Sequence, residues 1–77
     1  MKKEYLDKYR LIGLKINYYR KKKGYTQEQL AEKIGRHITF IGAVEAPNMN
    51  KSISLDTLFD IAKELDVEPY KFLMEDD

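Results

Sequence analysis

The side chains that most often carry catalysis or hold metal ions are scarce in this 77-residue chain. There is no cysteine, which excludes disulfides, thiolate metal sites and cysteine nucleophiles. His37 is the one histidine and there are two serines, so neither a multi-histidine metal site nor a Ser-His-Asp triad is indicated. We therefore expect a protein that is not an enzyme and has no metal and no cofactor, and we look for binding chemistry instead.

The composition is typical of one compact, mainly helical domain. Apolar residues make up 43% of the chain and charged residues 35%, with four glycines and two prolines. A chain of this length buries only about 60% of its unfolded surface and does not divide into two cores. The longest apolar run, residues 40–44, is far shorter than the roughly 20 residues that span a bilayer, and we expect no secretory signal, because the first residues lack an apolar stretch. We expect a cytoplasmic protein without membrane contact.

The first expected helix covers about residues 4–22. Its apolar side chains recur at steps of four and three, as on one face of an amphipathic helix. These side chains are Tyr5, Tyr9, Ile12, Ile16 and Tyr19. Gly24 supplies the left-handed residue that often ends a helix, and the basic run at 20–23 lies at the negative end of the helix dipole.

The strongest local signal is the start of a second helix at Gln27. Thr26 is followed three residues later by Gln29, the pattern of a capping box, in which each side chain bonds the backbone N–H of the other. Tyr25 and Leu30 occupy the two positions of a hydrophobic staple around this cap. The pattern predicts a well-defined helix start.

Two further helices are expected in the last third of the chain. Ser54 is a suitable N-cap and Asp56 lies in the first turn of the helix that follows. The inward stripe of that helix would be Leu55, Leu58, Ile61, Ala62 and Leu65. Pro69 suits the first position of a short fifth helix, whose apolar side chains are Tyr70, Leu73 and Phe72.

Residues 27–45 have the pattern of a helix-turn-helix, with two helices of about eight residues joined by the stretch 34–37. The two helices of this motif cross at close to a right angle. The crossing requires a small residue in the first helix, a glycine in the turn and apolar anchors in the second. Ala31, Gly35, Ile41 and Val44 meet these demands together, although each alone would be an ordinary core residue.

On these residues the chain resembles the Cro and phage-repressor-like helix-turn-helix family, also called the Xre family. The segment 20–35, RKKKGYTQEQLAEKIG, is similar to the end of that family's first helix and its second helix. Residues 40–45 and 54–67 are similar to its third and fourth helices. The resemblance implies an all-α, compact five-helix bundle of the phage-repressor-like DNA-binding type, with the helix-turn-helix formed by helices 2 and 3.

The extent of the resemblance also sets the expected domain organisation. It covers about residues 11–73, so we expect a single helix-turn-helix domain over residues 1–77 with this stretch as its core. Residues 1–10 would extend the first helix, and residues 74–77 would form a frayed acidic tail.

The resemblance implies which side chains face DNA. The recognition helix, about residues 38–45, would lie in the major groove. The base-facing positions are then His37, Ile38, Thr39, Gly42 and Ala43. The phosphate-facing positions are Gln27, Arg36, Asn48, Asn50 and Lys51, with solvation as the alternative for Arg36 and for the three loop residues. Arg20 and Glu45 match a salt-bridged pair between helices 1 and 3, the alternative being two separately solvated side chains.

The base-facing positions depart from the glutamine, arginine, serine or asparagine that the family often places there. Hydrogen bonds to bases can then come only from Thr39, His37 and Arg36. Ile38 and Ala43, if exposed, could meet thymine methyl groups, which are the apolar features of the major groove. In the alternative interpretation Ile38 is buried and His37 only caps the third helix.

The formal net charge of +1 conceals a gradient along the chain. Residues 1–23 carry nine basic and two acidic side chains, residues 24–51 three of each, and residues 52–77 two basic and eight acidic. Affinity for DNA depends on lysines and arginines close to phosphates. We therefore expect the basic side to face DNA, the acidic side to face away, and binding to be modest and strongly dependent on salt.

The sequence thus predicts a transcriptional regulator that binds double-stranded DNA sequence-specifically. A homodimer is expected, because one recognition helix reads only a few base pairs and two half-sites multiply specificity. The alternative is a protein-interaction module on the same fold, such as an antitoxin or accessory subunit. Its protein partner would bind the acidic C-terminal side or the tyrosine-rich first helix, since aromatic residues are enriched at interfaces.

Overall fold

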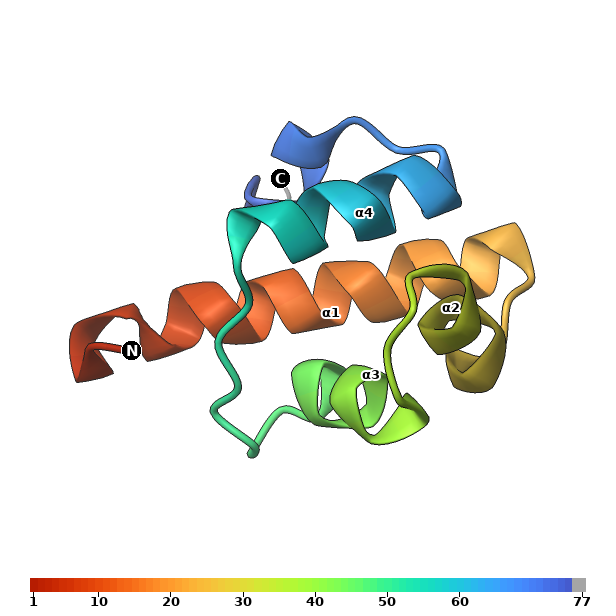
Figure 1. Ribbon diagram of the computed structural model, residues 1–77. Coiled ribbons are helices and arrows are strands. Elements are labelled where there is room, and N and C mark those ends of the chain that lie inside the picture. Colours follow the sequence, from red (N-terminus) through yellow and green to blue (C-terminus); the bar gives the residue numbers. More distant parts are fainter. Residues whose placement is uncertain (76–77) are drawn as a thin grey trace.

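The computed structural model describes residues 1–75, and it is built around one long central helix (Figure 1). In chain order the elements are the 3-10 helix η1 (Lys3–Tyr5), α1 (Leu6–Lys23), α2 (Gln27–Lys33), α3 (Ile38–Glu45), α4 (Leu55–Leu65) and the 3-10 helix η2 (Pro69–Phe72). α1 lies between α2 and α3 on one side and α4 on the other (Figure 1). Residues 1–75 contain no strand, which confirms the all-α class. None of the helices among them is long and apolar enough to cross a membrane.

The α-helices number four in the described residues, so the expectation of five was wrong. The segment after Pro69 forms only the short 3-10 helix η2, with hydrogen bonds to the third residue along the chain. Because a 3-10 helix has three residues per turn, one side chain per turn faces inward. That side chain is Phe72, which is buried, whereas Tyr70 and Leu73 are exposed. Residues 76–77 of the expected acidic tail lie outside the described residues.

α1 begins at Leu6, after η1, and ends as the glycine signal predicted. Gly24 has a φ of 86°, and its N–H donates to the last carbonyls of the helix. Of the expected apolar stripe, Ile12 and Ile16 are buried and Tyr19 packs edge-on against Phe72, with ring centroids 5.4 Å apart. Tyr5 lies outside the core because its turn belongs to η1 and not to α1.

α1 and α3 touch through their backbones at Gly13. A Cβ atom at this position would overlap the backbone carbonyl oxygen of Val44. The glycine therefore permits an approach that any other residue would prevent. This contact brings the third helix close enough to α1 for the polar side chains of the two helices to meet.

α4 starts where expected but buries a different side chain in its first turn. The N–H of Thr57 donates to Oγ of the N-cap Ser54 at 3.1 Å. Leu55, expected in the inward stripe, is 62% exposed, whereas Thr57 is buried. Leu55 is the first residue of the helix, so it precedes the turn that packs on α1 and α2, and the remaining stripe from Leu58 to Leu65 is buried as predicted.

Candidate nucleic-acid interface

The turn between α2 and α3 is short and closed by backbone hydrogen bonds. Gly35 has a φ of 69°, in the left-handed region that favours glycine, and no atom would crowd a Cβ there. The N–H of Arg36 donates to the carbonyl of Ala31 at 2.9 Å. Ala31, Ile41 and Val44 are all buried, as the motif requires. The predicted helix-turn-helix is therefore present.

The start of α2 is fixed by the expected capping box. The N–H of Gln29 donates to Oγ1 of Thr26 at 3.0 Å, and the N–H of Thr26 donates to Oε1 of Gln29 at 2.9 Å. Leu30 is buried and Tyr25 is partly buried beside it. The first residue of α2, Gln27, thus has a defined position relative to the recognition helix.

His37 caps α3 with its imidazole ring. Its Nδ1 accepts the backbone N–H of Thr39 at 3.2 Å and lies 3.0 Å from Oγ1 of the same residue. A neutral histidine whose Nδ1 is an acceptor carries its proton on Nε2. In this tautomer the exposed ring offers one N–H donor, at Nε2, and Oγ1 of Thr39 lies beside the nitrogen that accepts its own backbone N–H.

The other base-facing positions on α3 have small or apolar side chains that differ in exposure. Ile38 is 39% exposed, so the alternative in which it is buried does not hold, although His37 does cap the helix. Gly42 and Ala43 are partly buried. A Cβ at Gly42 would lie 3.7 Å from Oε1 of Gln27, which is an ordinary contact. The side chain of Gln27 therefore lies beside Gly42.

Glu45, at the end of α3, is the centre of a buried polar network. Arg20 donates from Nε to Oε2 at 2.7 Å and from Nη2 to Oε1 at 2.9 Å, which forms the bidentate salt bridge expected from the sequence. Asn17 donates to the same carboxylate at 2.8 Å and Gln27 at 3.0 Å. Arg20 also donates from Nη1 to the carbonyl of Tyr25 at 2.8 Å. One carboxylate therefore ties α3 to both α1 and α2.

The protonation of Glu45 follows from this network. Burial on its own raises the pKa of the carboxyl group, because a charge is disfavoured away from water. The hydrogen bonds from Arg20, Asn17 and Gln27 and the positive charge of Arg20 outweigh burial, so the pKa is lowered overall. Glu45 is thus held as the anion that the network needs.

Arg36 and Lys51 meet at the ring of Phe40, near the start of α3. The guanidinium carbon of Arg36 lies 3.8 Å from the ring centroid and Nζ of Lys51 lies 5.7 Å from it. Nη1 of Arg36 also donates to Oγ1 of Thr57 at 3.4 Å. Arg36 is therefore held against the ring rather than simply solvated, and two cations gather beside the recognition helix.

The remaining residues expected to contact phosphate, Asn48 and Asn50, lie in the loop between α3 and α4. Asn48 and Asn50 are both exposed, and Asn50 has a left-handed φ of 45°. Its Oδ1 lies 3.5 Å from Nη2 of Arg10 on α1, at the outer limit of a hydrogen bond. The structure thus groups Arg36 with Lys51 and places Asn50 beside Arg10.

Three residues that shape this surface were not singled out in the sequence. Gly13 allows α3 to approach α1, Asn17 donates to Glu45, and Phe40 holds the two cations. Gly13, Asn17 and Arg20 lie four and three residues apart, which is one face of a helix. That spacing is a signal that would have marked this face of α1 as a packing surface, but it does not identify α3 as the element that packs there.

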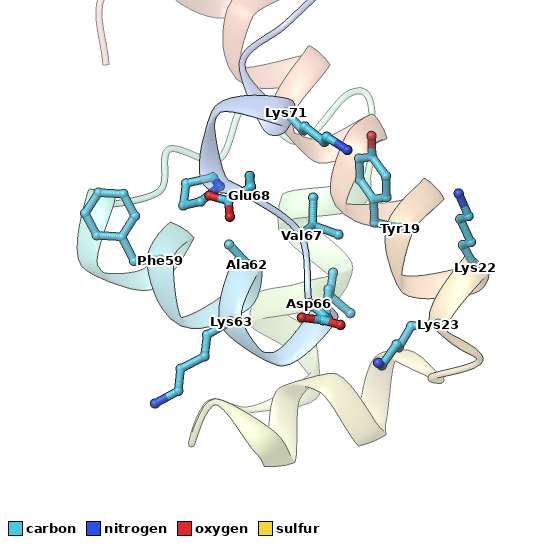
Figure 2. A pocket seen from close by; sticks show the side chains of 12 residues that line it. Tyr19, Lys22, Lys23, Phe59, Ala62, Lys63, Asp66, Val67, Glu68 and Lys71 are labelled. Carbon is cyan, nitrogen blue, oxygen red and sulfur yellow. The ribbon is translucent and has the colours of Figure 1, made fainter.

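A hollow of about 690 Å³ lies on the α4 side of α1, between the end of α1, α4 and the segment that leads into η2 (Figure 2). Four lysines line it, namely Lys22, Lys23, Lys63 and Lys71. Asp66 and Glu68 line the same hollow, and Tyr19 and Val67 lie among them. The C-terminal side of the molecule is thus mixed in charge here, and not uniformly acidic.

Known proteins share both the sequence pattern and the fold. A helix-turn-helix family model matches residues 16–72. The HTH-type transcriptional regulator SinR of Bacillus licheniformis is 36% identical over 67 residues, 87% of this chain and 60% of SinR. The control protein C.SmaI of Serratia marcescens is 36% identical over 69 residues, 90% of this chain and 80% of that protein.

A solved structure extends the likeness to three dimensions. The crystal structure of SinR, the master regulator for biofilm formation, in complex with DNA matches with a TM-score of 0.75 at 35% identity. The match covers 82% of this chain and 98% of that one. The chain spans only about 60% of the full SinR relative, so the likeness concerns the helix-turn-helix unit. The resemblance noted in the sequence is confirmed, and the chain belongs to the helix-turn-helix family of the Cro and phage-repressor-like type.

Proposed function

We propose that this protein is a transcriptional regulator that binds double-stranded DNA sequence-specifically, as a homodimer, with α3 in the major groove. The observation that carries the proposal is the exposure of His37, Ile38 and Thr39 at the start of α3, a helix whose other end is tied to α1 and α2 by the Glu45 network. Base readout needs side chains that are exposed and also held in place. The kinship with SinR, whose structure contains DNA, supports the same function.

The chemistry at the start of α3 suggests what the base-facing side chains read. The Nε2–H of His37 can donate to a base acceptor such as N7 or O6 of guanine, and the Thr39 oxygen can accept from an exocyclic amine. Ile38 and Ala43 can contact thymine methyl groups. Gly42 contributes no side chain and leaves room for Gln27 at the same surface.

Phosphate binding would come from the two cations that gather at Phe40, near the start of α3. Arg36 and Lys51, both on Phe40, are positioned to neutralise phosphates next to α3. Gln27 donates to Glu45, and its side-chain oxygen stays near Gly42, so its role would include support of the readout surface. Asn48 and Asn50 would contact the backbone from the loop after α3.

Selection of bound sequences from a random duplex pool, followed by fluorescence anisotropy on the selected duplex, tests this proposal. Thr39→Ala should weaken binding about tenfold to a hundredfold and relax the preference at one base pair, because a base contact contributes about 1–3 kcal/mol. Lys63→Ala, on the exposed side of α4, is the matched control and should leave affinity unchanged. Absence of binding at micromolar protein in low salt, or equal affinity for selected and random duplexes, would overturn the proposal.

A further inference from the structure

The side chain of Gln27 extends from the start of α2 to the surface of α3 beside Gly42. Its Nε2 donates to Oε1 of Glu45 at 3.0 Å. Its own Oε1 would lie 3.7 Å from a Cβ atom at Gly42. Gly42 is one of the positions expected to face bases, and it has no side chain of its own. The amide of Gln27 therefore lies next to the place where a base-reading side chain at position 42 would begin.

The carboxylate of Glu45 fixes which end of the Gln27 amide points toward it. Burial raises the pKa of Glu45, but the hydrogen bonds from Arg20, Asn17 and Gln27 and the charge of Arg20 lower it overall, so the group is an anion. An anionic carboxylate only accepts hydrogen bonds. With the amide turned around, Oε1 of Gln27 would meet a second acceptor and the hydrogen bond would be lost. Nε2 therefore faces Glu45, and Oε1 is held on the side of Gly42.

Oε1 of Gln27 is an acceptor without a donor inside the protein. Within residues 1–75 no hydrogen bond ends on this atom. It is also not one of the buried polar atoms that lack a partner there, so it is open to solvent. A phosphate oxygen cannot satisfy it, because both atoms are acceptors. In the major groove the matching donors are the exocyclic amines, N6 of adenine and N4 of cytosine.

We propose that Gln27 is a specificity-determining residue, whose Oε1 accepts a hydrogen bond from the exocyclic amine of an adenine or a cytosine beside Gly42. The inference rests on the proposed function, in which α3 lies in the major groove, and it assigns base readout to a residue of α2. The second hydrogen of Nε2 remains for a phosphate, so the contact that the family resemblance implies is compatible with this one. Gly42 serves the readout by its missing side chain, since a long side chain at this position would occupy the same space.

The variant Gln27→Lys separates the acceptor from the structural role of Gln27. A lysine keeps a donor for Glu45, but it has no acceptor. Sequences selected from a random duplex pool should differ between wild type and Gln27→Lys at one base pair, where only wild type prefers an amine-bearing base. The added positive charge strengthens binding to all duplexes alike, so the base preference is the readout and the affinity is not. Thr39→Ala should change the preference at a different base pair.

Removal of the amine from the DNA tests the contact itself. In the selected duplex, the adenine or cytosine of this base pair is replaced by the analogue that carries hydrogen in place of the exocyclic amine. Wild type should bind the altered duplex about fivefold to tenfold more weakly in fluorescence anisotropy, because Oε1 of Gln27 is then unpaired. Gln27→Lys and Gln27→Met should bind the two duplexes equally. Thr39→Ala leaves Gln27 in place and should keep the full sensitivity to the amine.

The outcomes separate this inference from the proposed function. A wild-type protein that prefers no duplex would refute the proposed function, and the inference with it. A wild type that selects a sequence but tolerates loss of the amine at every adenine and cytosine of the site would refute the inference alone. This arm needs no substitution, so it decides the question even if a variant folds poorly. Equal sensitivity to the amine in wild type and Gln27→Lys would also refute the inference, because another residue would then make the contact.

Discussion

Glu45 shows how one buried charge organises the recognition surface. Its carboxylate accepts hydrogen bonds from Arg20 and Asn17 on α1 and from Gln27 on α2, while Glu45 itself ends α3. Removing one partner of such a buried network leaves the others unpaired, which costs more than the intact pair contributes. The network therefore holds α3 in one orientation, and its charge state should be visible in the stability of the protein.

The pH dependence of unfolding should report Glu45. Its pKa is lowered in the folded state, so its stabilising contribution is complete above the unfolded pKa of about 4.3 and is lost as the pH falls through the lower folded pKa. We expect the free energy of urea unfolding to decrease between about pH 5 and pH 3, and Glu45→Gln to flatten part of this decrease while already being less stable at pH 7. Glu32→Gln, at an exposed position, is the control. Equal pH profiles for wild type and Glu45→Gln would contradict this role.

His37 combines two roles that one substitution can separate. Asparagine is a good N-cap, so His37→Asn should keep the free energy of unfolding within about 0.5 kcal/mol of wild type, whereas His37→Ala should lose about 1 kcal/mol. Both variants lack the Nε2–H donor and should bind the selected duplex more weakly. Urea unfolding and anisotropy on the same samples measure the two effects. Full DNA affinity in His37→Asn would mean that the imidazole only caps α3.

At the scale of helices, two glycines of similar sequence context should respond oppositely to alanine. Gly42 lies within α3, where a Cβ would make an ordinary contact, so Gly42→Ala should stabilise the protein by about 0.5–1 kcal/mol through helix propensity. Gly13 lies within α1, where a Cβ would overlap the carbonyl of Val44, so Gly13→Ala should destabilise it by about 2 kcal/mol or more. Thermal unfolding measures both. Stabilisation by both substitutions would show that α1 and α3 do not pack through their backbones.

Local sequence patterns predicted where helices start but not which residues meet between helices. Capping signals are local chemistry, and the starts of α2, α3 and α4 at Gln27, Ile38 and Leu55 follow from the residues directly before them. Gly13 does not cap or end a helix; it matters because α3, which is distant in sequence, packs against it. The burial of Thr57 in place of Leu55 has a partly similar origin, since its hydroxyl accepts a hydrogen bond from Arg36 across the fold as well as one from the nearby Ser54. Side-chain partners distant in sequence were thus the part that patterns could not supply.

For the candidate site, the family resemblance predicted which residues to consider but not the contacts that their side chains make with one another. His37 and Thr39 were expected beside one another, and they prove to share a hydrogen bond that decides which atoms remain for bases. Arg36 was expected to be solvated or bound to phosphate, whereas the ring of Phe40 holds it in place. Such details depend on side-chain packing between neighbouring turns, which spacing alone does not encode.

For the whole molecule, the near-zero net charge is compatible with DNA binding because the charges are unevenly placed. Residues 1–23 have an excess of seven basic side chains, and Arg36 and Lys51 add two cations next to α3. The acidic side chains of residues 52–75 all belong to α4 and the chain beyond it, and α4 lies on the opposite side of α1 from α3 (Figure 1). The long-range field should therefore orient the protein on DNA more than it strengthens binding.

This distribution makes a quantitative prediction about salt. Each phosphate neutralised by a lysine or arginine adds about 0.9 to the slope of log affinity against log salt concentration. Lys51→Ala should therefore reduce the slope by about one and weaken binding to selected and random duplexes alike, because a phosphate contact carries no base preference. Lys63→Ala removes the same charge from α4, which would lie away from the DNA, so it should leave the slope unchanged. If net charge alone set the slope, both variants would reduce it equally. Anisotropy titrations across a range of salt concentrations separate the two cases, and equal slopes for Lys51→Ala and Lys63→Ala would mean that the loop after α3 does not touch the DNA backbone.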